Sequence, residues 1–183
     1  MAQNFELKQA IGRAAATEVM AGATLLINDG STTFHLVTYL KNMGPLTIYT
    51  NSLAMIAELG GSAGIALYIL GGKYNSDLYS LQGSLTEQML ELLSIDLAFI
   101  GTDAIDDEGR CLVTTPEEAN LTKAMLRSGR KKILLADHNK LGAKGNIVYG
   151  TLQDYDMWIT TPGIGEEKLR DFRKQVEIVE AEL

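Results

Sequence analysis

Polar side chains and glycines gather in five short segments of this sequence, and each segment directly follows a run of apolar residues. Hydroxyl, carboxylate, amide and ammonium groups in such segments suit the binding of a small polyhydroxylated anion. The candidate ligand-binding residues are Asp29, Gly30, Ser31, Thr32, Thr33, Thr50, Asn51, Ser52, Gly71, Gly72, Lys73, Gly101, Asp103, Asp137 and Lys140.

The first segment has the composition of an anion-binding loop. Gly30 permits an unusual backbone turn, and Ser31, Thr32 and Thr33 open a helix. The free N–H groups and the positive dipole end of a helix favour a phosphate or a carboxylate. Ser31 or Thr32 could equally serve as an ordinary N-cap. The segment is not a Walker A loop, because no Gly-Lys-Ser/Thr follows the glycine.

Other polar residues also have a structural alternative. Lys140 is either a cation at the same site or a solvated surface charge. Asp103 and Asp106 could orient sugar hydroxyls or act as acid/base groups. Alternatively they form a turn, and the sequence Asp-Asp-Glu-Gly at 106–109 is typical of one. Of the two histidines, we expect His138 to line a site and His35 to be packed or to cap a helix.

The elements that position these groups alternate between helices and short strands. Helical spacing of apolar residues predicts a first helix over residues 6–20. The predicted strands are almost continuously apolar, which is typical of strands covered on both faces. The sequence therefore predicts an α/β fold with a mostly parallel sheet flanked by helices, whose polar loops share the edge where such sheets bind ligands. The strands are expected at 24–28, 46–50, 65–70, 96–100, 133–136 and 157–160.

Two of the later helices carry start signals. Ser84 and Glu87 have the spacing of a capping box for a helix that runs to about residue 93. Thr115, Pro116 and Glu118 supply an N-cap, a first-turn proline and a capping-box acid for the next helix. Each cap would stabilise its helix by roughly 1 kcal/mol.

The C-terminal part of the chain continues the same pattern. Gly129 suits the left-handed cap at the end of the helix that begins near Pro116. A helix over 166–172 and a strand over 176–179 complete the expected fold. With 183 residues and no repeat or linker, the chain fits one domain.

Composition excludes several classes of function. The formal charge of −7 opposes binding to a polyanion such as DNA, since that affinity comes largely from lysine and arginine. One cysteine and two histidines far apart in the sequence give neither a disulfide nor a metal cluster, and no cofactor is expected. No apolar run is long enough to cross a membrane and no secretion signal is present, so we expect a soluble cytoplasmic protein without a membrane partner.

Read in order, the motifs resemble the C-terminal effector-sensing domain of DeoR-family bacterial transcriptional repressors. Each motif alone is weak, but their order and spacing cover nearly the whole chain. The matching segments are Ala-Ile-Gly-Arg-Ala-Ala-Ala at 10–16, Asn-Asp-Gly-Ser-Thr-Thr at 28–33, Thr-Asn-Ser at 50–52, Leu-Gly-Gly at 70–72, Asp-Leu-Ala-Phe-Ile-Gly-Thr-Asp-Ala-Ile-Asp at 96–106, Thr-Thr-Pro-Glu-Glu-Ala at 114–119, Lys-Ala-Met at 123–125 and Leu-Leu-Ala-Asp-His-Asn-Lys-Leu-Gly at 134–142.

The resemblance implies a fold similar to ribose-5-phosphate isomerase and CoA transferases, and a domain over 1–183 that binds a phosphorylated sugar as inducer. It implies that DNA is bound only through an N-terminal winged helix-turn-helix domain, which is absent from this sequence, and that the protein forms a homodimer or a homotetramer. By position, 29–33 resembles the phosphate and sugar loop, 50–52 and 71–73 resemble pocket walls, and Asp103, Lys123 and Lys140 resemble the groups that face the ligand.

Two alternatives remain open. A sugar-phosphate isomerase could use Asp103 or Asp106 with Lys123. In the isomerases a glycine-rich loop precedes a catalytic glutamate, whereas 112–116 reads Leu-Val-Thr-Thr-Pro and the position of the glutamate falls near Thr122. Threonine is no general base near neutral pH, so no catalytic residue is assigned. The other alternative is a pure oligomerisation module, which would bind no small molecule.

Overall fold

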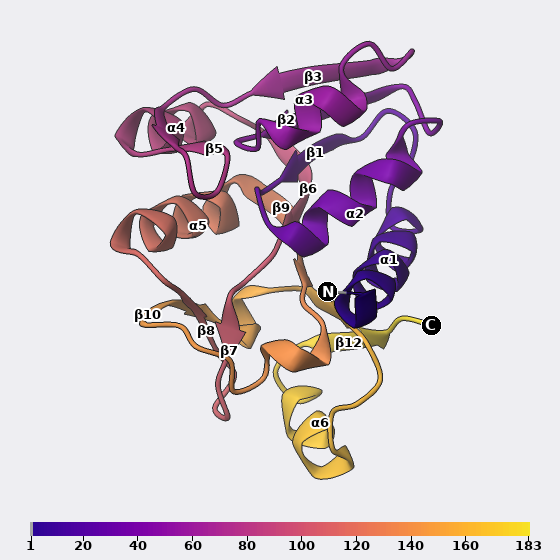
Figure 1. Ribbon diagram of the computed structural model, residues 1–183, viewed down its shortest axis with the longest axis vertical. Coiled ribbons are helices and arrows are strands. Elements are labelled where there is room, and N and C mark those ends of the chain that lie inside the picture. The colour runs from indigo at the N-terminus through magenta and orange to yellow at the C-terminus, as the bar shows by residue number, and fades with distance from the viewer. Residues whose placement is uncertain (1) are drawn as a thin grey trace.

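A seven-stranded sheet forms the centre of the molecule, with strand order β12-β11-β9-β6-β1-β2-β3 and parallel pairing throughout (Figure 1). The structure is a computed structural model that describes residues 2–183. The strands are β1 (Thr24–Ile27), β2 (Leu46–Thr50), β3 (Ile65–Ile69), β6 (Ile95–Ile100), β9 (Gly129–Leu135), β11 (Met157–Thr160) and β12 (Glu177–Glu180). The predicted α/β class and each predicted strand are therefore confirmed.

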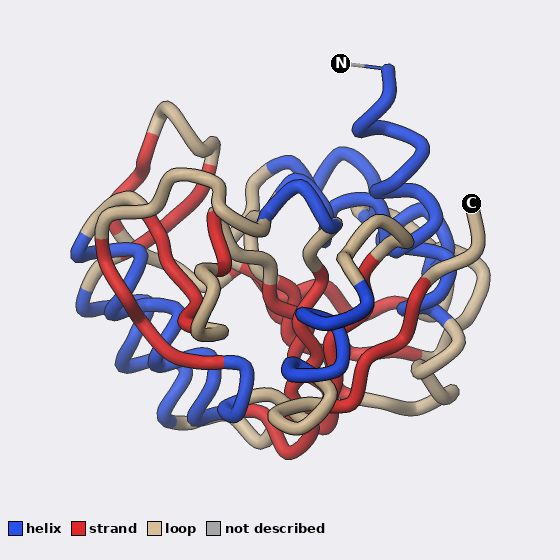
Figure 2. The backbone as a smooth tube through the Cα atoms, turned by 90° about the horizontal axis from the view of Figure 1, so that it is seen from below, coloured by secondary structure: helices blue, strands red, loops and turns tan. Residues whose placement is uncertain are grey.

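Helices cover both faces of this sheet, and Figure 2 shows the strands between the two groups. One face packs on α1 (Ala2–Ala16), α2 (Ser31–Leu40) and α3 (Ala54–Leu59). The other packs on α4 (Ser84–Glu91), α5 (Pro116–Ser128) and α6 (Glu166–Phe172). Leu25 and Ile27 of β1 point into the first core and Leu26 into the second, as the alternation of a strand requires.

Two small antiparallel sheets flank the main one, and the sequence did not predict them. β10 (Ile147–Thr151), β8 (Arg110–Val113) and β7 (Ala104–Ile105) form a three-stranded sheet. β4 (Lys73–Asn75) and β5 (Ser80–Gln82) form a hairpin. Short 3₁₀ helices follow β9 and β10, namely η1 (His138–Lys140) and η2 (Leu152–Asp154).

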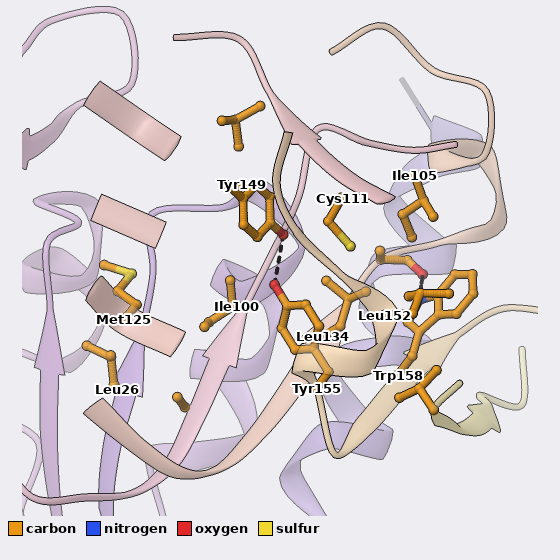
Figure 3. Packing of buried hydrophobic residues seen from close by; sticks show 14 of the residues in the cluster. Leu26, Ile100, Ile105, Cys111, Met125, Leu134, Tyr149, Leu152, Tyr155 and Trp158 are labelled. Carbon is orange, nitrogen blue, oxygen red and sulfur yellow. Dashed lines mark hydrogen bonds between the residues drawn. The ribbon is translucent and has the colours of Figure 1, made fainter. Parts of the chain in front are cut away.

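The small three-stranded sheet extends the core on the α5 face. Figure 3 shows Tyr149 of β10 beside Tyr155, with their hydroxyl oxygens 2.8 Å apart. Trp158 is fully buried and donates its indole N–H to the Ala136 carbonyl at 2.9 Å. Cys111 lies in the same cluster, and burial raises the pKa of its thiol to about 12. This cysteine is therefore a packing residue without a thiolate at neutral pH.

The predicted left-handed cap at Gly129 is wrong. Gly129 has φ −89° and ψ 136°, which is extended backbone, and it is the first residue of β9. A Cβ atom there would lie 2.6 Å from the Cβ of Ala98. The glycine is needed for the close approach of β9 to β6, where it pairs with Ile95. This pairing also explains why β9 begins four residues before the predicted start.

Two other helix ends differ from expectation. Ser84 is the first residue of α4 rather than its cap, because Gly83 takes the N-cap position at φ 100° and its carbonyl accepts the Glu87 N–H at 3.1 Å. The first helix ends at Ala16 rather than at residue 20. After it, tight i→i−3 bonds follow, and the Thr17 hydroxyl donates to the Ala14 carbonyl at 2.7 Å. The capping box of Thr115 and Glu118 is confirmed.

Helices α1 and α2 are in direct backbone contact. Gly12 is buried in their interface, and a Cβ atom at this position would lie 2.7 Å from the carbonyl carbon and oxygen of His35. Any other residue would force the two helices apart, so this glycine sets their spacing.

Candidate functional site

A cleft of about 510 Å³ opens at the carboxyl edge of the sheet, as the loop pattern predicted. The loops after β1 and β6, the first turn of α2, the β4–β5 hairpin, α5 and η1 all contribute to it. The predicted residues that line it are Asp29, Gly30, Ser31, Thr32, Ser52, Gly101, Asp103 and Lys140.

Asn28 organises one end of the cleft. Its side chain is almost fully buried, and its Oδ1 accepts hydrogen bonds from the N–H of Gly30 at 3.3 Å and of Gly101 at 3.0 Å. Its Nδ2 donates to the Gly101 carbonyl at 3.4 Å. One side chain therefore fixes the loop after β1 against the loop after β6.

Gly30 is closely packed and does not adopt an unusual backbone turn. Its φ of −65° and ψ of 144° are ordinary extended values, so the expectation of a special backbone conformation is wrong. A Cβ atom would lie 3.1 Å from both Asn28 Oδ1 and Thr33 Oγ1. The hydroxyl of Thr33 faces inward, 2.7 Å from the Gly30 carbonyl and 2.8 Å from the Asn28 carbonyl, and stabilises the loop from behind.

The N-terminus of α2 faces the cleft without a cap. Gly30 holds the N-cap position, and none of the side chains that the structure describes caps this helix end. The alternative of Ser31 or Thr32 as an ordinary N-cap is therefore wrong. The N–H groups of the first turn have no partner within the helix, and they carry its positive dipole end.

Two lysines from distant segments lie beside this helix end. Lys140 of η1 lines the cleft, and Lys8 of α1 donates to the Ser31 hydroxyl at 2.9 Å. Burial lowers the pKa of Lys8, the nearby charge of Lys140 lowers it further, and Asp137 opposes the shift. This end of the cleft thus combines two ammonium groups and N–H donors, which suit an anion, with the carboxylate of Asp29 in the same loop. Sequence reasoning missed Lys8, because no local motif distinguishes it from other helical lysines.

The opposite end of the cleft is rich in carboxylates. Asp103 accepts a hydrogen bond from the Thr114 hydroxyl at 3.0 Å. Glu118 accepts from the N–H and the hydroxyl of Thr115 at 2.8 and 2.9 Å. Asp77, at the tip of the β4–β5 hairpin, is the third acid that lines this region. Together with the amide of Gln82, these groups can accept hydrogen bonds from a polyhydroxylated ligand.

Thr122 lies in the cleft wall, one turn after Glu118. It is nearly buried and donates its hydroxyl to the Glu118 carbonyl at 2.7 Å. Thr122, near which the position of the isomerases' catalytic glutamate falls, is therefore inside the site. Its hydroxyl cannot act as a general base near neutral pH. The carboxylate of Glu118 is engaged in the cap of α5.

The β4–β5 hairpin is anchored to the loop after β2. Asn51 accepts the Leu81 N–H at 2.9 Å with its backbone carbonyl and donates its Nδ2 to the Leu81 carbonyl at 3.2 Å. The N–H of Leu53 donates to the carbonyl of Tyr79, which has a positive φ of 50°. Segment 50–52 therefore supports the hairpin that lines the cleft, and of its three residues Ser52 reaches the cleft itself.

The other predicted residues lie outside the cleft lining. Thr50 accepts the Ser52 N–H at 3.1 Å, and Asp137 accepts the Asn139 N–H at 2.9 Å. Gly72 packs against Thr86, where a Cβ atom would lie 2.2 Å from the hydroxyl oxygen. The residues that the structure places elsewhere are Thr33, Thr50, Asn51, Gly71, Gly72, Lys73, Lys123 and Asp137. Lys73 and Lys123 are exposed to solvent.

The roles expected for the two histidines are reversed. His35 lines the cleft from α2, and both burial and the charge of Lys8 lower the pKa of its imidazole. His138 lies outside the lining, with its Nδ1 2.8 Å from the Thr161 hydroxyl. Asp106 also lies outside and makes the turn between β7 and β8, where its carboxylate accepts the Arg110 N–H at 2.8 Å. The turn alternative is correct for this aspartate.

Sequence reasoning did not propose several residues of the lining. They are Asn28, Phe34, His35, Ala54, Asp77, Leu78, Gln82, Thr102, Val113, Glu118, Leu121, Thr122 and Met125. Within residues 2–183, no group of three or more acidic, histidine or cysteine side chains could hold a metal ion. No helix of the described chain is both long enough and apolar enough to cross a membrane.

A family model of the DeoR C terminal sensor domain matches residues 3–161. The chain belongs to this family.

Curated relatives of this sensor domain are transcriptional regulators. It is 32% identical over 155 residues to the HTH-type transcriptional repressor GlcR of Bacillus subtilis and 29% identical over 158 residues to the regulator GlpR of Haloferax volcanii. It is 27% identical over 179 residues to a putative aga operon repressor of Escherichia coli O157:H7. These matches cover 85%, 86% and 97% of this chain but 59%, 62% and 66% of the relatives, so the chain spans about three fifths of their length.

Solved structures share the fold of the sensor domain. A D-ribose-5-phosphate isomerase in complex with phospho-erythronic acid has a TM-score of 0.53 and 16% identity, covering 74% of this chain and 53% of its own. The translation initiation factor eIF-2B of Pyrococcus horikoshii has a TM-score of 0.59 and 15% identity, covering 85% and 62%. At these identities the similarity shows the α/β architecture alone, and the expected likeness to ribose-5-phosphate isomerase is confirmed at that level.

Proposed function

We propose that the chain is the effector-sensing part of a transcriptional regulator and that its cleft binds a phosphorylated sugar. The family and the regulatory relatives support the role in transcription. Contact with DNA would come from a part of the protein outside this sequence, since the chain has a formal charge of −7. Such a regulator would act in the cytoplasm together with its DNA.

The observation that carries the ligand proposal is the uncapped N-terminus of α2 within the cleft, flanked by Lys140 and Lys8. A phosphate here would accept hydrogen bonds from the first-turn N–H groups and compensate the charge of the two lysines. The sugar would extend toward Asp103, Asp77 and Glu118, whose carboxylates accept hydrogen bonds from hydroxyl groups. This polarity favours ligands with a phosphate at one end and hydroxyls at the other.

We propose binding without turnover. Aldose–ketose isomerisation needs a positioned base next to the carbonyl. Thr122 cannot supply one, and Glu118 is held by two hydrogen bonds from Thr115. Asp103, the acid of the isomerase alternative that lines the cleft, accepts a hydrogen bond from the Thr114 hydroxyl at 3.0 Å. Lys123, the cation of the isomerase alternative, is exposed and lies outside the lining.

A thermal-shift screen against sugar phosphates and the corresponding free sugars tests this proposal. At a hundred times its dissociation constant, a ligand adds about 2.7 kcal/mol, which raises the melting temperature by roughly 5–10 °C. We expect a phosphorylated hit whose free sugar is inactive. Lys140→Ala should abolish the shift, whereas Lys123→Ala, an exposed lysine outside the cleft, should retain it.

The other functions give different results in the same experiment. Conversion of the hit into another sugar phosphate, followed by NMR, would establish the isomerase alternative. If no compound shifts the wild-type protein, the phosphate site is refuted and the oligomerisation module takes its place. In that case Lys140→Ala and Asp29→Ala would have no effect on small-molecule binding.

A further inference from the structure

The two edges of the central sheet differ in how they meet solvent. β12 forms one edge and carries exposed glutamates at both ends, and Arg173 pairs with Glu180 at 3.3 Å. β3 forms the other edge with the sequence Ile-Ala-Leu-Tyr-Ile and no charge. Charged residues on an edge strand prevent pairing with another chain, whereas an apolar edge of β-branched and aromatic residues favours it.

The hydrogen bonds of β3 define which backbone groups face outward. Leu46 donates to the carbonyl of Gly64, and Leu70 donates to the carbonyl of Thr50, so the even-numbered residues of β3 bond to β2. The backbone groups of Ile65, Leu67 and Ile69 therefore point away from β2. Within residues 2–183 no strand pairs with this side, and in Figure 1 β3 lies at the upper margin of the sheet.

The surface next to this edge is also apolar. Tyr68 is 51% exposed and stacks on Tyr49 of β2, with ring centroids 4.8 Å apart. Leu85 and Met89 of α4 and Leu92, the C-cap residue of this helix, are also exposed. The Gly71 N–H lies 3.2 Å from the Met89 sulfur, which joins α4 to the chain directly after β3. Contiguous exposed apolar side chains of this kind mark an interaction surface.

We propose that β3 pairs with β3 of a second copy of this chain, antiparallel about a two-fold axis through Leu67. In this register Leu67 forms a hydrogen-bonded pair with its own copy, and the Ile69 N–H donates to the Ile65 carbonyl of the partner. Ile65 needs no further acceptor, since its N–H already donates to the Ser62 carbonyl at 3.3 Å. The two central sheets become one continuous sheet.

Side-chain size selects a second copy as the occupant. In the proposed register Ala66 lies opposite Tyr68 of the other copy, in the pair type where side chains approach most closely. The ring of Tyr68 thus faces the methyl group of Ala66, and this pair occurs twice because the interface is isologous. In a shifted register with the two-fold axis at Tyr68, the two Tyr68 side chains would lie directly opposite each other. The strand carries no charge, so no like charges meet when it pairs with itself.

Charge exchange across this pair tests the proposal. The wild-type chain is expected to be a dimer in sedimentation velocity and light scattering. Ala66→Lys and Tyr68→Glu, each at an exposed position, should raise the dimer dissociation constant about tenfold or more, because each places an unpaired charge in the interface twice. The double variant Ala66→Lys/Tyr68→Glu should recover dimerisation, since each ammonium then faces a carboxylate of the other copy.

A control variant and a covalent cross-link test whether the dimer contact runs through β3 itself. Val148→Glu, which alters a 40% exposed apolar residue on the edge strand β10, should leave the dimer intact. Ala66→Cys/Tyr68→Cys should form a covalent dimer under mild oxidation, because the paired Cα atoms come within disulfide range. The native Cys111 is buried and cannot contribute.

Three results would overturn the proposal. They are a monomeric wild-type chain at all concentrations, a dimer that Ala66→Lys and Tyr68→Glu leave unchanged, and a folded double variant that stays monomeric. None of these depends on the ligand screen, so the edge pairing and the sugar-phosphate site can fail separately.

Discussion

The α2 end of the cleft is built mainly from consecutive residues of one loop, whereas the opposite end is assembled from segments far apart in the sequence. At the α2 end, the buried Asn28 side chain bonds to Gly30 and Gly101 and fixes two loops at once. At the opposite end, Asp77 lies on an exposed hairpin, and Glu118 is held by the cap of its own helix. A ligand phosphate would therefore bind to a preformed site, and the sugar would contact carboxylates that lie on separate elements, the β4–β5 hairpin and α5.

Matched asparagine variants should give the largest difference between these ends. Asn28→Ala leaves the N–H groups of Gly30 and Gly101 without their acceptor in a largely buried loop, and we expect a loss of about 2–3 kcal/mol in unfolding free energy. Asn75→Ala removes the acceptor for Asp77 and Leu78 N–H groups in an exposed hairpin turn and should cost less than about 1 kcal/mol.

Chemical denaturation of the two variants measures these losses. Equal losses would show that the α2 end is no more rigidly built than the hairpin.

Removal of one charge at each end should separate anion binding from sugar recognition. Lys8→Met removes a cation near the proposed phosphate and should weaken binding of the phosphorylated hit about tenfold, or about 1.4 kcal/mol. Asp77→Asn retains an acceptor oxygen at the hairpin tip and should change the affinity for that ligand less than about threefold. Calorimetric titration gives both values. A loss that is larger for Asp77→Asn would reverse the assigned polarity of the cleft.

The smallest effect is a pH dependence at the α2 end. Because burial and the charge of Lys8 lower the pKa of His35 below its ordinary 6.5, the unfolded chain takes up this proton at a higher pH than the folded protein does. The folded protein therefore loses stability through His35 as the pH falls below about 6.5.

Melting temperatures between about pH 7.5 and 5.5 should show this slope, and His35→Gln should reduce it. His138→Gln, at the histidine outside the cleft, is the control. An unchanged slope in His35→Gln would show that Lys8 and burial do not act on this histidine as the structure indicates.

The difference between the two ends also explains what the sequence could predict. The strands are identifiable because both faces are buried and their residues are almost all apolar, as in Leu25–Ile27. The loop after β1 is identifiable because its functional groups are adjacent in the chain. Placement of these loops at one edge then follows from parallel topology alone.

Residues whose role depends on distant contacts could not be predicted. Nothing near Lys8 in the sequence shows that it reaches Ser31, and nothing near Asp77 shows that its hairpin folds over the cleft. Gly129 is a residue type typical of a helix C-cap. Only the structure shows that a side chain at this position would collide with Ala98 on the neighbouring strand. Thr33 and Asn51 were expected at the ligand, but they support the loops that line the cleft.

The contact at Gly12 has a mechanical consequence. Where two helices touch through side chains, rotamer changes can absorb a small displacement, but here backbone meets backbone at His35 and no side chain lies between. Lys8 is one turn away from Gly12 on the same face of α1 and bonds to the first residue of α2. The two helices are thus rigidly coupled, and a displacement of the first turn of α2 would move α1 with it.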